Sequence, residues 1–143
     1  MPSPAEFEPI ADDEILYRRV PVSKGWIDEH GVWPDAFEPR ADDDTGLSVY
    51  RARFVSLEDA AKGLSKRGYY VLAMRAGDLR AVGIDVVPMP HDDLPGHAEI
   101  PSLAYHERET ELSRQQRELL ADRLVIAIHG PSVPQQTDLN SGS

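Results

Sequence analysis

Apolar and polar residues alternate over residues 15–20, and this period of two predicts a β-strand that ends at Pro21. Successive side chains of a strand point to opposite faces, so Arg18 and Arg19 are expected on opposite faces of the sheet. A second run of strand-forming residues spans 47–54. The first half of the chain is therefore predicted to contribute two strands.

A helix is predicted directly after Ser56. The serine hydroxyl can accept the unpaired N–H groups of the first helical turn, and two acidic residues follow where the helix dipole favours them. The next apolar residues fall at i, i+3, i+4 and i+7 and form one stripe: Leu57, Ala60, Ala61 and Leu64. Gly68 is suited to end the helix, so residues 57–67 are expected to be helical.

The rest of the chain carries weaker local signals. Residues 69–75 and 79–87 are rich in strand-forming side chains on either side of a short turn, which predicts a β-hairpin. Ser113 and Gln116 have the spacing of a capping box and predict a second helix. The apolar run 124–128 fits either a continuation of that helix or a last strand.

Residues 21–46 hold several glycines and prolines and only scattered apolar residues, so a long loop is expected there. A loop of this length is functional or is held by its own anchors, which we expect to be Trp26, Ile27, Trp33 and Phe37. The two chain ends, 1–12 and 131–143, are rich in proline and polar residues. They are expected to be disordered tails around one domain over 13–130.

These elements together predict a single α+β domain with a mostly antiparallel sheet, about two helices and a long aromatic loop. A chain of 143 residues, of which 41% are hydrophobic, can bury one core. No apolar run approaches the length of a membrane span, and the N-terminus does not resemble a signal peptide. A cytoplasmic protein without membrane contact is expected.

The charge and the lack of cysteine restrict the chemistry. Without cysteine the chain has no disulfide, no thiolate metal site and no cysteine nucleophile. A formal charge of −10 opposes nucleic-acid binding through phosphate neutralisation. The same acidity suits a basic protein partner, or serves solubility alone. The oligomeric state does not follow from the sequence.

Histidines and carboxylates are concentrated in residues 91–99. His91, His97 and Glu99 could hold zinc, manganese or iron. We nevertheless expect no tightly bound metal and no other cofactor, because a proline-bounded loop does not preorganise two histidines. His97-Ala98-Glu99 also matches half of the zinc deaminase signature, but the half with two cysteines is missing.

A second set of residues follows a recognisable order along the chain. Arg18 or Arg19, then Ser48, then Glu99 resemble the arginine, serine and glutamate series of ADP-ribosyltransferases and NAD-degrading toxins. The resemblance implies that the arginine binds the dinucleotide, that the serine-bearing strand shapes the nicotinamide pocket, and that the glutamate stabilises a cationic ribosyl transition state. This chain has one serine where that family shows a Ser-x-Ser or Ser-Thr-Ser pattern. It has no Gly-x-Ser-x-Gly elbow and no Walker lysine.

Four short segments resemble a group of small bacterial proteins of unknown function. These segments are Leu16-Tyr17-Arg18-Arg19-Val20-Pro21, Ala36-Phe37, Leu47-Ser48-Val49 and Pro95-Gly96-His97-Ala98-Glu99-Ile100. The resemblance covers residues 15–100. It implies a bacterial origin and a compact α+β domain, and it supplies no catalytic residues.

Three classes of function remain open. The first, which we rank highest, is a non-enzymatic accessory, adaptor or immunity-type protein that binds a basic partner through an acidic aromatic surface: Trp26, Trp33, Phe37, Asp42, Asp43 and Asp44. The second is an NAD-acting enzyme that uses Arg18, Ser48 and Glu99. The third is a small metal-dependent enzyme that uses His91, His97 and Glu99.

Overall fold

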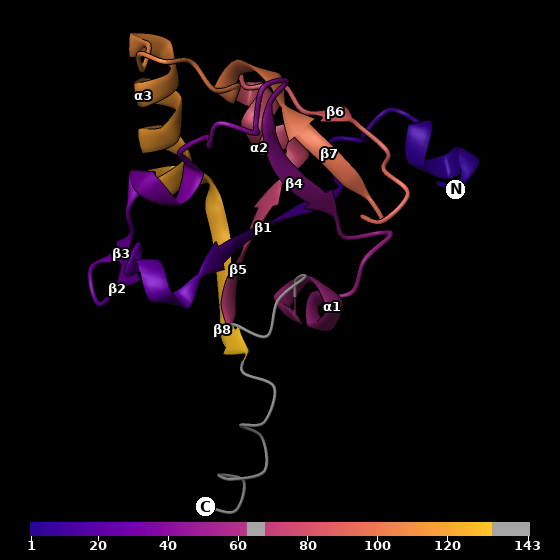
Figure 1. Cartoon of the computed structure of the whole chain (residues 1–143), viewed down its shortest axis with the longest axis horizontal. Helices are drawn as coiled ribbons and strands as arrows, with labels where there is room; N and C mark the ends of the chain where they lie inside the picture. The colour runs from indigo at the N-terminus through magenta and orange to yellow at the C-terminus, as the bar shows by residue number, and fades with distance from the viewer. Residues whose placement is uncertain (63–67, 133–143) are drawn as a thin grey trace, which may run out of the picture.

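A six-stranded antiparallel sheet forms the centre of the molecule, with the strand order β6-β7-β4-β1-β5-β8 (Figure 1). The computed structural model describes residues 1–62 and 68–132. Every pairing in the sheet is antiparallel, which confirms the predicted fold class. The strands are β1 (Ile15–Pro21), β4 (Leu47–Arg51), β5 (Tyr69–Arg75), β6 (Val87–Pro88), β7 (His97–Ile100) and β8 (Val125–Ser132).

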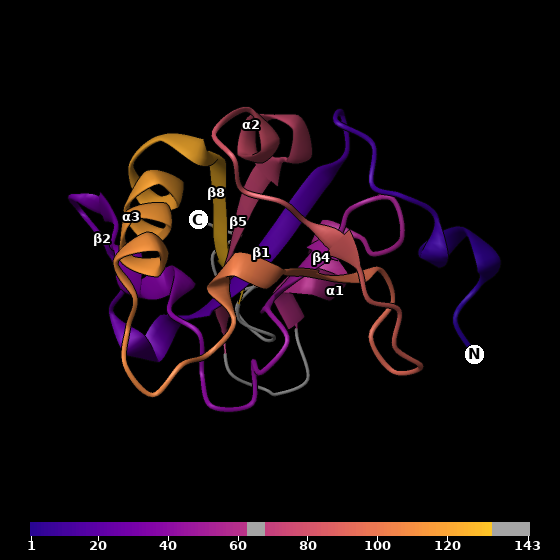
Figure 2. The same cartoon turned by 90° about the horizontal axis from the view of Figure 1, so that it is seen from above.

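Helices cover both faces of this sheet (Figure 2). The larger core lies between one face and α2 (Ala76–Ala81), the 3-10 turn Pro34–Phe37 and the turn Leu120–Leu124, which continues α3 (Glu111–Leu119). The smaller core lies on the other face, where α1 (Leu57–Lys62) packs its alanines against Val71. Among the described residues, no helix is long and apolar enough to cross a bilayer.

The start of α1 confirms the prediction made from Ser56. The Ser56 Oγ atom accepts the Asp59 N–H at 3.0 Å, and both Ala60 and Ala61 are buried. The predicted continuation of the helix through residue 67 lies outside the described residues. Local sequence signals thus specify where this helix begins.

The predicted hairpin between 69–75 and 79–87 is wrong. Strand β5 forms as predicted, but the chain then turns into α2, and β5 pairs with β1 and β8. Ala76 and Leu79 are fully buried and lie three residues apart, which is a helical spacing. Gly83 follows the helix with a positive φ of 82°, and only the short β6 forms within the predicted second strand.

The predicted start of the second helix is also wrong. Thr110 caps α3, since its Oγ1 atom accepts the Ser113 N–H at 3.0 Å, so Ser113 lies inside the helix. Gln116 accepts a hydrogen bond from Ser102 and takes no part in capping. The apolar run 124–128 contributes to β8, which selects the strand from the two alternatives left open for it.

The long loop contains more structure than expected. A small hairpin of β2 (Ile27–Asp28) and β3 (Gly31–Val32) occupies its middle. Strand β4 ends at Arg51, three residues earlier than predicted. The Phe54 N–H donates to the Arg51 carbonyl and forms a turn there, while the Ala52 N–H donates to the Ile15 carbonyl of β1. Residues 133–143 of the expected C-terminal tail lie outside the described residues.

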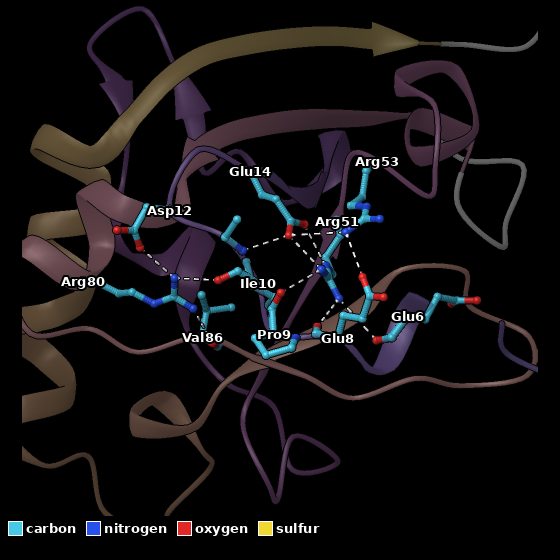
Figure 3. Close-up of polar contacts among 11 residues, drawn as sticks. Glu6, Glu8, Pro9, Ile10, Asp12, Glu14, Arg51, Arg53, Arg80 and Val86 are labelled. Carbon is cyan, nitrogen blue, oxygen red and sulfur yellow. Dashed lines mark hydrogen bonds and ion pairs between the residues drawn. The ribbon is translucent and has the colours of Figure 1, made fainter. Parts of the chain in front are cut away.

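The N-terminal segment is attached to the sheet by a buried arginine, in contrast to the tail expected over 1–12 (Figure 3). Arg51 has a fully buried side chain that donates to both carboxylate oxygens of Glu14, at 2.8 and 2.7 Å. Ile10 enters the core. The remaining Arg51 donors bond three main-chain carbonyls, those of Glu6, Glu8 and Pro9. A buried guanidinium needs partners for all its donors, and the N-terminal segment supplies them.

Candidate functional site

The sheet opens between β1 and β4. These strands pair at Leu16↔Arg51 and Tyr17↔Tyr50. Beyond that point β1 continues beside β5 as far as Pro21, whereas β4 continues beside β7. The second half of β1 and the first half of β4 therefore diverge and form a fork in the sheet.

A groove of about 460 Å³ lies at this fork. Its walls carry four cationic residues, three acidic residues and three aromatic rings. They are Arg18, Arg19, Lys24 and Arg40, then Glu38, Asp42 and Asp43, then Trp26, Tyr50 and Tyr69, with Pro21, Pro39 and Ser48 between them. Four cationic and three acidic residues thus share one groove, so its lining has a small excess of positive charge in an otherwise acidic chain.

Arg18 spans the fork. Its Nε donates to the Ala36 carbonyl at 3.1 Å and its Nη1 to the Ser48 carbonyl at 3.0 Å, so it links β1 to the long loop and to β4. Burial lowers the pKa of this guanidinium, although an arginine keeps its charge at any physiological pH. Arg18 therefore holds the groove walls in place and supplies a fixed positive charge.

Arg19 lies on the opposite face of β1, which confirms the prediction for the arginine pair. Its Nε donates to the Ala60 carbonyl at 2.8 Å, and its guanidinium carbon lies 4.2 Å from the centroid of the Tyr50 ring. Within the described part of the chain its two Nη groups have no hydrogen-bond acceptor. They are the free donors that a bidentate anion such as phosphate would use.

Ser48 is bound to His97 across two neighbouring strands. The Ser48 Oγ lies 3.0 Å from His97 Nε2, and His97 Nδ1 lies 2.8 Å from the Met89 carbonyl oxygen. A carbonyl only accepts, so in a neutral imidazole Nδ1 carries the proton and Nε2 accepts from the serine hydroxyl. With the imidazole in that neutral form, Ser48 donates to His97 and presents acceptor lone pairs to the groove.

Glu99 lies directly opposite Ser48 in the β4–β7 pairing. Side chains at opposite positions of an antiparallel pair share a face, with Cβ atoms about 5 Å apart. The Glu99 side chain is buried and accepts the Thr45 hydroxyl at 2.6 Å. Gly46 allows this close packing, because a Cβ atom there would lie 3.0 Å from the Glu99 Cβ.

The residues considered for a metal are only partly brought together. His91 is exposed, its Nδ1 accepts the Asp93 N–H at 3.0 Å, and its ring centroid lies 6.3 Å from that of His97. Both His97 nitrogens are already hydrogen-bonded. Across residues 1–62 and 68–132, no group of three or more histidines or carboxylates is arranged to hold a metal ion.

The residues expected to bind a partner lie in different environments. Trp33 is 48% exposed, whereas Trp26 packs partly against the core. Phe37 is fully buried and is therefore removed from the expected partner surface. The aspartates 42–44 stay near the surface, and two of them, Asp42 and Asp43, line the fork groove.

Sequence reasoning missed the pairing of His97 with Ser48 and the groove positions of Lys24, Arg40 and Tyr50. One relation was detectable from the sequence: His97 and Glu99 are two residues apart on a strand and so share a face of the sheet.

The chain matches no protein-family model, no curated protein and no solved structure.

Proposed function

We propose that the fork groove binds a dinucleotide such as NAD and that the protein transfers or hydrolyses its ribosyl group. One observation carries this proposal: Ser48 lies in a groove with two arginines, and Glu99 lies directly opposite it on the next strand. The three residue types whose chain order resembles the ADP-ribosyltransferase series thus lie on the neighbouring strands β1, β4 and β7, with the buried Glu99 beside the groove and not in its lining. We rank this function above non-enzymatic binding because of that placement.

The groove has the chemistry that a dinucleotide requires. A pyrophosphate carries two negative charges, and the free Nη groups of Arg19 can bind it in a bidentate manner, with Lys24 and Arg40 as further cations. The rings of Trp26 and Tyr50 also line the groove, each with one cation of the chain against it, and a base or a nicotinamide can stack on such rings. Charge and stacking together distinguish this ligand from a simple inorganic anion.

The reaction breaks the bond between ribose C1′ and the nicotinamide nitrogen. Nicotinamide leaves with the electron pair of that bond, and the ribosyl group becomes cationic. The Glu99 carboxylate would stabilise that cation, and water or another nucleophile would form the new bond to C1′ and lose its proton. The Ser48 hydroxyl, which is hydrogen-bonded to His97, would accept a hydrogen bond from the ligand and position it.

The test combines NAD binding by calorimetry with release of nicotinamide measured by chromatography. Glu99→Gln keeps the side-chain volume and removes the charge, so it should retain NAD binding and reduce turnover by about 10²- to 10³-fold. Glu58→Gln on the exposed side of α1 is the matched control and should change neither quantity. An intact wild-type protein that binds no NAD at millimolar concentration would contradict the proposal.

A second function, binding of a basic protein partner, is supported by a separate observation. Trp33 leaves half of its surface in water beside several carboxylates of the β2–β3 hairpin and the segment after it. Tryptophan is costly to expose and is enriched where proteins bind one another. Trp33 does not line the fork groove, so this second function rests on a different residue of the long loop.

A further inference from the structure

The two tryptophans of the chain lie opposite each other at the base of the β2–β3 hairpin. The register Ile27↔Val32 places Trp26 across from Trp33, and the Trp33 N–H donates to the Trp26 carbonyl at 2.9 Å. A pocket of about 280 Å³ lies beside them, lined by Gly25, Trp26, Asp28, Trp33 and Asp35. Two indole rings and two carboxylates thus share one small pocket, here called the tryptophan pocket.

The pocket has a fixed negative charge. The Trp33 Nε1–H donates to Asp28 Oδ2 at 2.8 Å, and the His30 N–H donates to Asp28 Oδ1 at 2.8 Å. These hydrogen bonds, that from Trp33 first, lower the pKa of Asp28. Asp28 therefore stays ionised and holds the exposed Trp33 ring in one orientation, while Asp35 adds a second exposed carboxylate.

The chain itself shows that one of these rings accepts a cation. The Lys24 Nζ lies 5.7 Å from the centroid of the Trp26 ring. Tryptophan is the best aromatic partner for ammonium and guanidinium groups, because its face carries the strongest negative potential. This contact is independent of the acidic residues and indicates the same class of ligand.

We infer that the tryptophan pocket receives a Lys or Arg side chain of a protein partner. The inference rests on the second proposed function, the binding of a basic partner. Indole walls fit the stem and head of a long cationic side chain, and the two carboxylates lie where its charge would be neutralised. A net charge of −10 attracts such a partner over longer distances. Because Trp26 lines both cavities, the bound segment lies next to the fork groove.

Tryptophan fluorescence gives a direct test, since the chain contains two tryptophans and both line this pocket. The probe is a short peptide of alternating glycine and arginine. Its matched control replaces each arginine with citrulline, which has almost the same shape and no charge. We expect the arginine peptide to shift or quench the emission in a saturable way and the citrulline peptide to leave it unchanged.

Calorimetry on variants then locates the binding site. Trp33→Ala and Asp28→Asn should each weaken binding of the arginine peptide by about fivefold or more. Asp13→Asn, an exposed acid on the N-terminal segment, is the control and should bind like wild type. Thermal melts show whether each variant is folded, and Trp33→Phe, which keeps an aromatic face, should bind with an affinity between those of wild type and Trp33→Ala.

The outcomes separate the pocket from the wider function. If the peptide binds equally well to Trp33→Ala and Asp28→Asn but not to a variant with Asp42, Asp43 and Asp44 changed to lysine, the inference about the pocket is wrong and the basic-partner function stands. If the arginine peptide does not bind wild type at all, both are wrong. If Asp13→Asn weakened binding of the arginine peptide as much as Asp28→Asn does, the effect would be one of overall charge, and the inference about the pocket would also be wrong.

Discussion

At the scale of single residues, three arginines of this chain have three different roles. Arg51 is fully buried, is paired with Glu14 and is bound to main-chain carbonyls. Arg18 bridges two groove walls, and Arg19 keeps its terminal donors available. The same side chain is structural where burial requires every donor to be satisfied, and it has donors available for a ligand where they are left unpaired.

Removal of Arg51 tests the structural role. Arg51→Ala leaves the largely covered Glu14 carboxylate without its partner and frees the carbonyls of the N-terminal segment, so it should cost about 3–5 kcal/mol of unfolding free energy. Arg53→Ala is the control, because Arg53 is exposed and lies 3.9 Å from the same carboxylate. Urea denaturation should show a change below about 1 kcal/mol for that variant. A similar loss for both would contradict the assignment.

At the scale of elements, helix ends depend on short polar signals that compete along the chain. Ser56 and Thr110 both accept an N–H three residues ahead, and each begins its helix. Ser113 satisfies the same sequence rule and lies inside α3. Two candidates for one cap cannot be separated by spacing alone, because the choice depends on which residue the chain brings to the helix start.

Cap substitutions distinguish these candidates. Ser56→Ala and Thr110→Ala each remove the acceptor for a first-turn N–H and should cost about 1 kcal/mol. Ser113→Ala removes a hydroxyl that caps nothing and should cost less than about 0.5 kcal/mol. Denaturant midpoints at an unchanged slope provide the measurement. A larger loss for Ser113→Ala than for Thr110→Ala would show that α3 begins where the sequence alone predicts.

At the scale of the whole molecule, the N-terminal segment ties distant parts of the chain together. Glu6 accepts the Gly96 N–H at 2.9 Å. Glu14 pairs with Arg51 on β4, and Arg80 at the end of α2 donates to the Ile10 carbonyl at 2.7 Å (Figure 3). Residues 6–14 thus join β4, the turn before β7, and α2. The segment thus contacts β4, which carries Ser48, and the turn that leads into β7, which carries Glu99.

Acid should release this segment. The Gly96 N–H lowers the pKa of Glu6. Burial raises the pKa of Glu14, but the hydrogen bonds and charge of Arg51 outweigh burial and lower it. A carboxyl with a lowered pKa stabilises the fold above its unfolded pKa of about 4.3, and this stability is lost as the pH falls through the folded value. Urea midpoints measured from pH 7 to pH 3 should therefore fall, with a smaller fall for Glu14→Gln. An identical pH profile for the variant would rule out this linkage.

The sequence by itself determined the features that depend on neighbours along the chain. The period of two over residues 15–20 specified β1 and the opposite faces of Arg18 and Arg19, and Ser56 specified the start of α1. The antiparallel α+β class followed from the sum of such segments. The order Arg, Ser, Glu along the chain also named the residues of the proposed site.

Tertiary structure decided everything that depends on which segments meet. Residues 76–81 became a helix because two of them fill the core at helical spacing, although their neighbours favour strand. The fork between β1 and β4, the pairing of Ser48 with His97 and the binding of the N-terminal segment by Arg51 all join residues more than 30 positions apart. The secondary-structure propensity of a segment depends on its own residues and does not describe such long-range contacts. Their energy comes from burial and from satisfying buried polar groups, and both are settled only when the whole chain has folded.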